Sequence, residues 1–236
     1  MVGQAMKEKH SECFLLWSET SEFKTKVLET KRLIDEVLKR YSKPYLAYSG
    51  GKDSITMIHL VLSKNRNIAL VHWDYGRYYI PREIEREILS IAEYCGATNI
   101  QILTSSLYNE LKRTAKGVIG KYFIGIEVPK LIKKGYNACF LGLRAEESNK
   151  RRKRLKWFYE YDKRGITNIF PLKNWAWKDV WAYIVSNNLP YPSIYDRYAE
   201  VLGYDKVRLV TFFDMEFERL GSVYVDGVLM PEFRNI

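Results

Sequence analysis

A short segment at residues 49–54, Ser-Gly-Gly-Lys-Asp-Ser, combines residue types that suit the binding of phosphate. It follows an apolar run at residues 45–48 and precedes apolar residues at helical spacing, which predicts a strand, a turn and a helix. Gly50 and Gly51 can adopt positive φ angles and bring backbone amides close to an oxyanion. The first turn of the following helix adds free N–H groups and the positive end of its dipole. We therefore expect an anion site that is built largely by the backbone.

The polar side chains of this segment have complementary roles in that interpretation. Lys52 supplies a mobile cation, and the hydroxyl groups of Ser49 and Ser54 can donate hydrogen bonds to phosphate oxygens. Asp53 can either cap the helix or hold a magnesium ion that bridges phosphates. A plain strand-to-helix turn is the alternative, but two glycines combined with hydroxyl groups and a cation favour a phosphate site.

Two further loops follow expected strands, where ligands of parallel sheets bind. Asp74 directly follows the second strand, so its carboxylate can accept hydrogen bonds or hold a metal, although aspartate there is also an ordinary turn former. In the third loop, Arg144 and Arg151 can grip phosphate or sulfate through their guanidinium groups. Glu146 can orient one of these arginines.

The pattern of apolar residues predicts strands that alternate with helices. Expected helices cover residues 22–41, 82–95, 127–133 and 177–188, with further helical residues around 108–116. Expected strands cover residues 45–48, 68–73, 99–104, 138–142 and 168–171. Because this alternation requires crossover connections, we expect an α/β fold, a Rossmann-like domain with a mostly parallel sheet flanked by helices.

The length of 236 residues suits one substantial core, so a single domain is expected. We expect a helical segment at 1–41 packed on the core, a nucleotide-binding α/β domain at 42–200, and an extension of the same unit at 201–236. An Asp-Gly pair between alternating apolar residues predicts a hairpin at 223–229 in that extension. No apolar run is long enough to span a bilayer and no signal peptide is recognisable, so we expect a cytoplasmic protein.

The cysteines and histidines lack the spacing of metal ligands. The three cysteines are Cys13, Cys95 and Cys139. Without a Cys-x-x-Cys pair they argue against zinc, an iron–sulfur cluster or a disulfide framework, and each is expected to be a buried small hydrophobic residue. The three histidines, which we expect to be structural, are His10, His59 and His72.

The net charge of +10 has two interpretations, a polyanionic partner or the cation-rich surface of a heat-adapted protein. A basic run at 150–156 precedes four closely spaced aromatic residues, Trp157, Phe158, Tyr159 and Tyr161. This run predicts a nucleic-acid surface on which bases stack, or else a solvated helix face with buried aromatic residues. It can also form part of a loop that grips a nucleotide.

Taken together, these motifs resemble the PP-loop ATP pyrophosphatase superfamily, in the branch that contains PAPS reductase and the small subunit of ATP sulfurylase. Residues 71–76 are similar to the branch's Val-x-x-Asp-Thr-Gly segment, and residues 142–151 to its Gly-x-Arg-x-x-Glu-Ser-x-x-Arg segment. Residues 171–175 resemble its Pro-Leu-x-x-Trp segment, which precedes an Asp-Val-Trp helix matched here at 179–181. Residues 192–196 approximate its Pro-Leu-Tyr-Asp segment.

The resemblance implies an adenine nucleotide alpha hydrolase-like fold and transfer of an adenylyl group from ATP to an oxyanion such as sulfate, with pyrophosphate released. It implies Mg²⁺ as a cofactor beside ATP, with a protein partner subunit or a homodimer as further expectations. The residues expected to bind the nucleotide are Ser49, Gly50, Gly51, Lys52, Asp53, Ser54, Asp74, Gly142 and Glu146. Lys52, Arg144 and Arg151 are the expected catalytic residues. Asp53 and Asp74 are the expected metal ligands.

Departures from the family pattern bear on the reaction. No cysteine follows Cys139, so the C-terminal thiolate of thiol-dependent PAPS reductases has no counterpart in this sequence. The intact Gly-Gly-Lys-Asp-Ser resembles the ATP-cleaving members, whereas residues 74–81 are one residue longer than the usual spacing. Two alternatives therefore remain: binding or reduction of a sulfonucleotide with a partner's thiol, and nucleic-acid binding or sulfur modification through residues 150–156.

Overall fold

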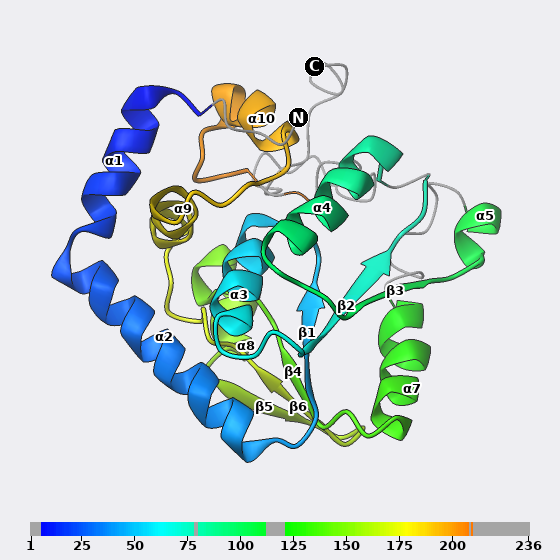
Figure 1. Cartoon of the computed structure of the whole chain (residues 1–236). Helices are drawn as coiled ribbons and strands as arrows, with labels where there is room; N and C mark the ends of the chain where they lie inside the picture. The colour runs from blue at the N-terminus through cyan, green and yellow to red at the C-terminus, as the bar shows by residue number, and fades with distance from the viewer. Residues whose placement is uncertain (1–5, 78–79, 112–120, 208, 210–236) are drawn as a thin grey trace.

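The structure is a computed structural model that describes residues 6–77, 80–111, 121–207 and 209 (Figure 1). The helices in these ranges are α1 (Glu8–Ser18), α2 (Ser21–Arg40), α3 (Lys52–Leu62), α4 (Arg82–Tyr94), α5 (Leu107–Leu111), α7 (Val128–Lys133), α8 (Asn149–Arg154), α9 (Trp177–Ser186) and α10 (Ile194–Leu202). The strands are β1 (Pro44–Tyr48), β2 (Ala69–Asp74), β3 (Ile100–Thr104), β4 (Ala138–Phe140), β5 (Tyr159–Asp162) and β6 (Ile166–Ile169).

The strands form one six-stranded sheet in the order β3-β2-β1-β4-β6-β5. All neighbouring pairs are parallel except β5 and β6, which are antiparallel. The chain steps outward from β1 to β2 and β3, and then crosses back to β4 on the other side of β1. This change of direction beside β1 creates the crevice in which parallel sheets bind their ligands. The expectation of a mostly parallel sheet flanked by helices is confirmed.

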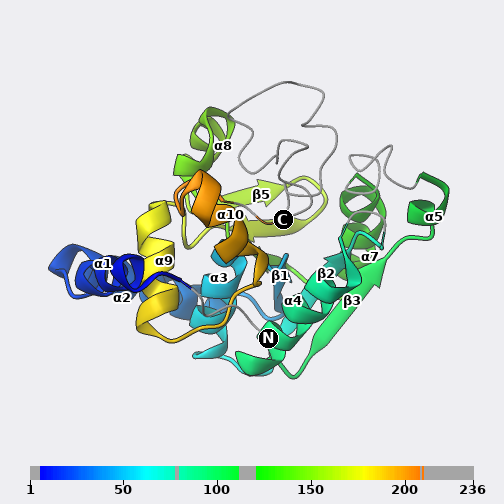
Figure 2. The ribbon, with the colours of Figure 1, turned by 90° about the horizontal axis from the view of Figure 1, so that it is seen from above.

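Helices cover both faces of the sheet, and alternate residues of each strand point to opposite faces. From β1, Leu46 and Tyr48 belong to the larger core, which includes buried residues of α2, α3, α4 and α9. Tyr45 belongs instead to a smaller core that contains Val128 and Leu131 of α7. Figure 2 shows α3 and α9 on one side of the sheet and α7 on the other. The sheet is therefore the middle layer of three, and its strand ends are held from both sides.

The N-terminal helices are tied to α9 by one buried carboxylate, Asp179, whose side chain is fully buried. It accepts hydrogen bonds from the indole Nε1 of Trp17 at 2.7 Å and from the Nζ of Lys26 at 2.9 Å. It also accepts the backbone N–H of Ala176 at 2.7 Å and so supports the first turn of α9. These bonds satisfy a carboxylate that would otherwise be costly to bury.

The elements missing from the sequence expectations include α1 as a separate helix, β5 and α10. α1 was missed because its apolar residues are consecutive, at positions 14–17, rather than at helical spacing. β5 was missed because it alternates tyrosine with acidic residues. α10 was missed although its apolar residues recur at helical spacing, because residues 192–196 were interpreted only as a motif. The expected helix at 127–133 begins at Val128, and a π-helix that was not expected precedes it at Phe123–Glu127. The expected hairpin at 223–229 lies outside the described residues, as does part of the expected helix at 108–116.

The expectation that every cysteine is buried holds for Cys139, holds only in part for Cys95 and is wrong for Cys13. Cys139 on β4 is buried and Cys95 after α4 is partly buried, but Cys13 on α1 is exposed. α1 packs through Phe14 and Ser18, so Cys13 is on the solvent side of that helix. Burial raises the pKa of the Cys95 thiol to about 11 and that of Cys139 to about 12. Neither thiol is therefore a nucleophile at neutral pH.

Candidate active site

The loop at residues 49–54 joins β1 to α3 at the carboxyl edge of the sheet. Gly50 has a φ of 77°, whereas Gly51 has a φ of −72°, so only the first glycine uses the left-handed region. A Cβ atom on Gly50 would lie 2.4 Å from Cγ1 of Ile88 on α4, which leaves no room for a side chain. Gly51 is the N-cap of α3 and provides no side-chain cap for the first helical amides. The loop therefore presents backbone N–H groups, as an anion site requires.

The two serines of the loop lie together. The hydroxyl of Ser49 donates to the hydroxyl of Ser54 at 3.2 Å, and Ser54 donates in turn to the carbonyl oxygen of Gly51 at 2.8 Å. The N–H of Gly51 donates to Ser49 Oγ at 3.4 Å, which is a long hydrogen bond. Both hydroxyl groups thus lie at the turn, where the sequence places them for contact with phosphate.

The side chain of Lys52 points into the protein and is only 1% exposed. Its ammonium group donates to the carbonyl oxygen of Val207 at 2.6 Å and lies 3.9 Å from Oδ2 of Asp53. The backbone N–H of Lys52 donates to the hydroxyl of Tyr195 on α10 at 3.0 Å. The sequence expects a mobile cation at this position, whereas the structure holds the ammonium group against the segment that follows α10.

A chain of charged groups runs from the loop to the segment after β4. Nε of Arg144 donates to Oδ1 of Asp53, and Nη1 of Arg144 donates to Oε2 of Glu146 at 2.9 Å. Arg144 is 3% exposed, and the same Glu146 oxygen accepts the N–H of Trp177 at the start of α9 at 2.8 Å. Arg144 is therefore fixed between two carboxylates, and Glu146 orients it as the sequence predicts. Arg151, in contrast, pairs with Glu147 within the same segment.

Gly142 follows β4 and lies directly against the start of α3. A Cβ atom built on it would be 3.0 Å from the carbonyl oxygen of Asp53 and 3.2 Å from the backbone nitrogen of Ser54. Because both neighbours are backbone atoms, a side chain here would push the phosphate loop away from β4. Gly142 is thus close to the expected nucleotide site through its backbone.

Asp74 lies at the end of β2 and is bound on both carboxylate oxygens. Oδ2 accepts a hydrogen bond from Nη1 of Arg82 at 2.9 Å, while Oδ1 accepts from Nη2 of Arg82 at 3.0 Å and from the N–H of Gly76 at 2.7 Å. Partial burial acts to raise the pKa of Asp74, but the bonds from Arg82 and Gly76 outweigh it and hold that pKa below its usual value. Asp74 is therefore ionised at neutral pH.

A cavity of about 220 Å³ opens beside the phosphate loop, between the ends of β1, β2 and β4. Ser49 and Ser54 form its polar side. The apolar and aromatic side is formed by Ala47, Tyr48, Val71, Trp73, Tyr75, Ile80, Phe123, Leu141 and Leu143, together with Gly142. An apolar cavity with a few polar groups at one side suits a flat aromatic ring that carries phosphate.

Sequence reasoning missed several residues that support this region. Arg82 holds Asp74, and its position one residue after Pro81 at the start of α4 gave no separate signal. Tyr195 had a signal, because it lies in the motif at 192–196, and its hydroxyl accepts N–H groups from both Lys52 and Leu209. The missed residues thus hold the loop and the strand end in place.

His72 is structural, as expected, but its buried partner was missed. Nδ1 of His72 lies 2.9 Å from the carbonyl oxygen of Tyr48, and Nε2 lies 2.6 Å from Oε1 of Glu85 on α4. Since a carbonyl oxygen only accepts, Nδ1 donates to Tyr48, and Nε2 is within hydrogen-bond distance of Glu85. This pair joins β1 and β2 to α4 next to the loop.

Both expected metal ligands are already engaged by cations. Arg82 and Gly76 bind both oxygens of Asp74, and Asp53 accepts a hydrogen bond from Arg144 and lies 3.9 Å from the ammonium group of Lys52. Within the described residues, no three histidine, cysteine, aspartate or glutamate side chains form a metal-binding group. Magnesium at nucleotide sites is usually held by one or two carboxylates and the phosphates. Either carboxylate would have to give up an arginine contact to bind the ion, and Asp53 is the one that lies in the phosphate loop itself.

A comparison with models of protein families identifies the chain. Residues 43–225 match the phosphoadenosine phosphosulfate (PAPS) reductase domain, over a range that includes every site residue named above. The chain belongs to the PAPS reductase domain family. This membership confirms the resemblance that the motifs at residues 49–54, 71–76 and 142–151 suggested.

Curated relatives of this PAPS reductase domain carry the names of different enzymes. Sulfate adenylyltransferase subunit 2 of Mycobacterium tuberculosis is 25% identical over 197 residues, which cover 71% of this chain and 62% of the relative. Adenosine 5′-phosphosulfate reductase 2 of Bacillus subtilis is 29% identical over 189 residues, which cover 74% of this chain and 79% of the relative. The chain thus spans 62% of the length of the adenylyltransferase subunit. The expectation of an enzyme agrees with both names.

Solved structures with the same fold support the α/β assignment of this family member. FMN adenylyltransferase of Candida glabrata aligns with a TM-score of 0.56 at 16% identity, covering 79% of this chain and 65% of that protein. Yeast FAD synthetase in complex with FAD aligns with a TM-score of 0.53 at 15% identity, covering 79% and 68% of the two chains. At this identity the likeness concerns the fold. Among the described residues, no helix has both the length and the apolar character needed to cross a bilayer.

Proposed function

We propose that this PAPS reductase-family protein binds Mg-ATP and transfers the adenylyl group to an oxyanion, with sulfate as the first candidate, releasing pyrophosphate. The observation that carries the proposal is the position of the loop at residues 49–54. It lies between the apolar cavity and the charged chain of Asp53, Arg144 and Glu146. In this arrangement the apolar cavity suits an adenine ring, the loop suits the phosphates, and the charged chain suits an anionic acceptor.

Each part of the nucleotide has residues that suit it. The adenine ring would occupy the cavity between Val71, Trp73 and Leu141, and the phosphates would meet the N–H groups of Gly51 and the first turn of α3. Ser49 and Ser54 can turn their hydroxyl groups from each other to phosphate oxygens. Asp53 would hold the magnesium ion, which neutralises charge on the phosphates when it is bound.

In the proposed reaction an acceptor oxygen forms a bond to the α-phosphorus of ATP as the bond to the pyrophosphate oxygen breaks. The electron pair leaves with pyrophosphate, so no protein nucleophile is required. Arg144 would stabilise the charge that spreads over the α-phosphate, because its position is already fixed by Asp53 and Glu146. Arg151 would act on the acceptor only after leaving Glu147. Lys52 would act on pyrophosphate only after leaving Val207.

A second candidate function is the binding or reduction of a sulfonucleotide. It is favoured by the similarity to the Bacillus subtilis relative named as an adenosine 5′-phosphosulfate reductase. Reduction would require a thiol from a partner protein or a small molecule, since burial raises the pKa values of Cys95 and Cys139 to about 11 and about 12. Cys13 is exposed on α1, which packs on α9.

Calorimetric titration separates the two candidates. We expect the purified chain to bind Mg-ATP in preference to 3′-phosphoadenosine 5′-phosphosulfate, and to bind ATP more weakly when magnesium is chelated. Tighter binding of the sulfonucleotide would reject adenylyl transfer in favour of the second candidate. Exchange of labelled pyrophosphate into ATP then tests the reaction, with sulfate and other oxyanions supplied as acceptors. Because one relative is named as a subunit, the exchange is also measured with a candidate partner present.

A further inference from the structure

The surface formed by α8, residues 155–158 and β5, which we call the α8–β5 surface, carries positive charge that its own acids do not balance. Each carboxylate between residues 146 and 162 has an arginine partner, in the pairs Glu146–Arg144, Glu147–Arg151, Glu160–Arg154 and Asp162–Arg164. Four cations of the same stretch, and Lys163 directly after β5, have no carboxylate partner among the described residues; the four are Lys150, Arg152, Lys153 and Lys156. Internal pairing therefore leaves a concentrated positive excess on this surface.

The fold holds these cations in place although they repel one another. In α8, Lys150 lies three residues before Lys153 and four before Arg154, a spacing at which like charges destabilise a helix. The helix is supported at its start by Ser148, whose hydroxyl accepts the N–H of Arg151 at 3.1 Å, and at its end by the pair between Arg154 and Glu160. A bound polyanion would relieve the repulsion that this arrangement retains.

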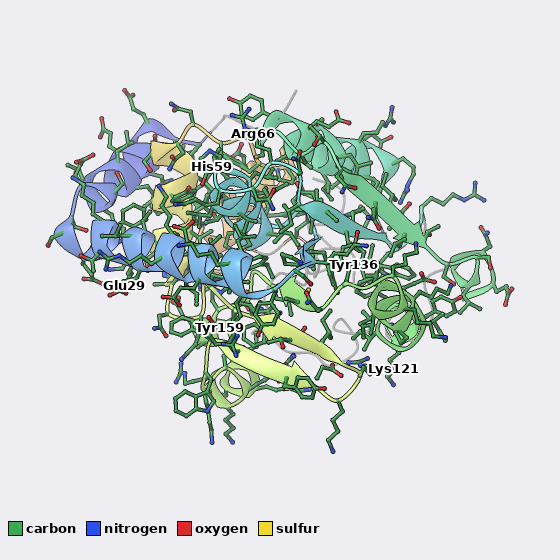
Figure 3. All side chains as sticks on the ribbon, turned by 60° about the horizontal axis from the view of Figure 1, so that its bottom comes forward. Glu29, His59, Arg66, Lys121, Tyr136 and Tyr159 are labelled. Atoms are coloured by element: carbon green, nitrogen blue, oxygen red, sulfur yellow. The ribbon has the colours of Figure 1, made fainter. Side chains whose placement is uncertain are left out.

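Aromatic rings are exposed beside the cations. Trp157 is 77% exposed and Tyr161 is 72% exposed, whereas Phe158 and Tyr159 are partly buried. The ammonium group of Lys173 lies 4.6 Å from the ring centre of Phe158, and Arg40 lies over Tyr159, which Figure 3 shows on β5 beside α2. The alternative of a solvated helix with buried aromatic residues thus fails for two of the four rings.

We propose that the α8–β5 surface binds single-stranded nucleic acid, with phosphates on its unbalanced cations and an unpaired base stacked on Trp157. Stacking on an exposed ring needs a base whose face is free, which favours single strands over duplexes. Binding to a membrane surface requires a larger apolar face. Between residues 140 and 175 the exposed large hydrophobic residues are Trp157 and Tyr161, which form a small one. A nucleic acid uses both the charge and the rings.

The α8–β5 surface adjoins the candidate active site. A cavity of about 430 Å³ is lined by Glu146, which holds Arg144, and by Arg152 of α8. A strand bound along α8 would therefore pass the acceptor side of that site. The binding proposal itself does not depend on adenylyl transfer, because it concerns residues outside the phosphate loop.

Binding is measured by fluorescence anisotropy on the full chain without nucleotide, using labelled single-stranded RNA and, separately, DNA of about 12 nucleotides. If four or five phosphates are neutralised, the logarithm of the association constant should fall with the logarithm of the salt concentration at a slope of about −3. A slope near zero would overturn the proposal. So would tighter binding to duplex DNA of equal length, or to vesicles of anionic phospholipid, than to either single strand.

Matched variants locate the surface. Replacing both Lys150 and Lys153 by Gln should weaken binding and make the slope shallower by about 1.4. The control replaces Lys9 and Lys39, two exposed lysines on α1 and α2, by Gln and changes the net charge equally. Equal losses in both double variants would show attraction to net charge alone and reject the α8–β5 surface.

The contribution of the aromatic ring is tested separately. Trp157→Ala should weaken binding by about 5-fold to 150-fold, since each stacked base contributes that much. The control is Tyr94→Ala, because Tyr94 is 68% exposed on α4 and lies outside the surface. Unchanged binding in Trp157→Ala would reject base stacking. Pyrophosphate exchange is followed on the same samples, so a failure of adenylyl transfer is seen independently of strand binding.

Discussion

The ammonium group of Lys52 and the carbonyl oxygen of Val207 are joined by a hydrogen bond of 2.6 Å across 155 residues of sequence. Lys52 is the second residue after the positive-φ glycine of the phosphate loop, and Val207 follows α10. Both side chains are almost fully buried. The segment after α10 is thereby attached to the ammonium group that we propose to act on pyrophosphate.

Removing this ammonium group should affect stability and ligand binding together. Lys52→Met keeps most of the apolar stem but leaves the Val207 carbonyl without its donor, which should lower the free energy of unfolding by about 1–3 kcal/mol. If Lys52 turns to the phosphates, Mg-ATP affinity should also fall by about 10-fold to 150-fold. Denaturant titration and calorimetry measure the two effects. A stability loss with unchanged ATP affinity would assign Lys52 a structural role only.

Arg144 should be sensitive even to a conservative change. Arg144→Lys keeps the charge but cannot reach Asp53 and Glu146 at once as the guanidinium group does. We expect the rate of pyrophosphate exchange to fall by about 100-fold to 1000-fold, which is the usual effect of removing one hydrogen-bond donor that stabilises a transition state. Arg86→Lys, at an exposed arginine of α4, is the control and should retain the rate. Equal rates for both variants would remove Arg144 from the proposed mechanism.

Gly50→Ala should destabilise the protein more than Gly96→Ala does, although both glycines have positive φ angles. Gly50 and Gly96 have φ angles of 77° and 90°, but a Cβ on Gly50 would meet Ile88 whereas nothing lies within 4 Å of one on Gly96. Both substitutions cost about 1–2 kcal/mol in backbone conformation, and Gly50→Ala adds about 1–3 kcal/mol of overpacking. Thermal unfolding compares the variants. If Gly50→Ala unfolds no earlier than Gly96→Ala, α4 is not packed on the loop as described.

The pair of Asp74 and Arg82 should make stability depend on acid pH. Because the folded pKa of Asp74 lies below its ordinary value of 3.8, the stabilisation is fully present above that value and is lost as the pH falls through the folded pKa. Wild-type protein should therefore lose unfolding free energy more steeply below pH 4 than Asp74→Asn does. Urea titrations at pH 6 and pH 3 measure this difference. Asp35→Asn, at the surface pair with Lys64, is the control and should follow the wild type.

The sequence predicted the parts of the fold whose signal is local. Apolar periodicity predicted α4 within one residue, and the two glycines predicted the loop between β1 and α3. The same methods missed β5, because an edge strand is defined by its pairing with β6 rather than by its own apolar residues. They also missed α1, whose apolar residues contact α9 without forming a regular stripe.

The sequence indicated which residues belong to the candidate site but not which residues bind them. Motifs selected Asp53, Asp74 and Arg144, since residue type at a strand end carries that information. The bonds from Arg82 to Asp74 and from Lys52 to Val207 depend on which helix and segment pack against the loop. Such contacts join residues far apart in the chain, so no spacing within the sequence reveals them.

The hydrogen bonds from Trp17 and Lys26 to Asp179 affect the order in which the helices can pack during synthesis of the chain. The partners of this carboxylate are separated from it by 162 and 153 residues, so the first two helices are synthesised long before their anchor exists. α2, α3 and α4 can meet β1 and β2 earlier, because their sequences are adjacent. α1, which contacts mainly α9, should therefore dock only after α9 has been synthesised, although it emerges first, and until then its apolar residues are available to chaperones.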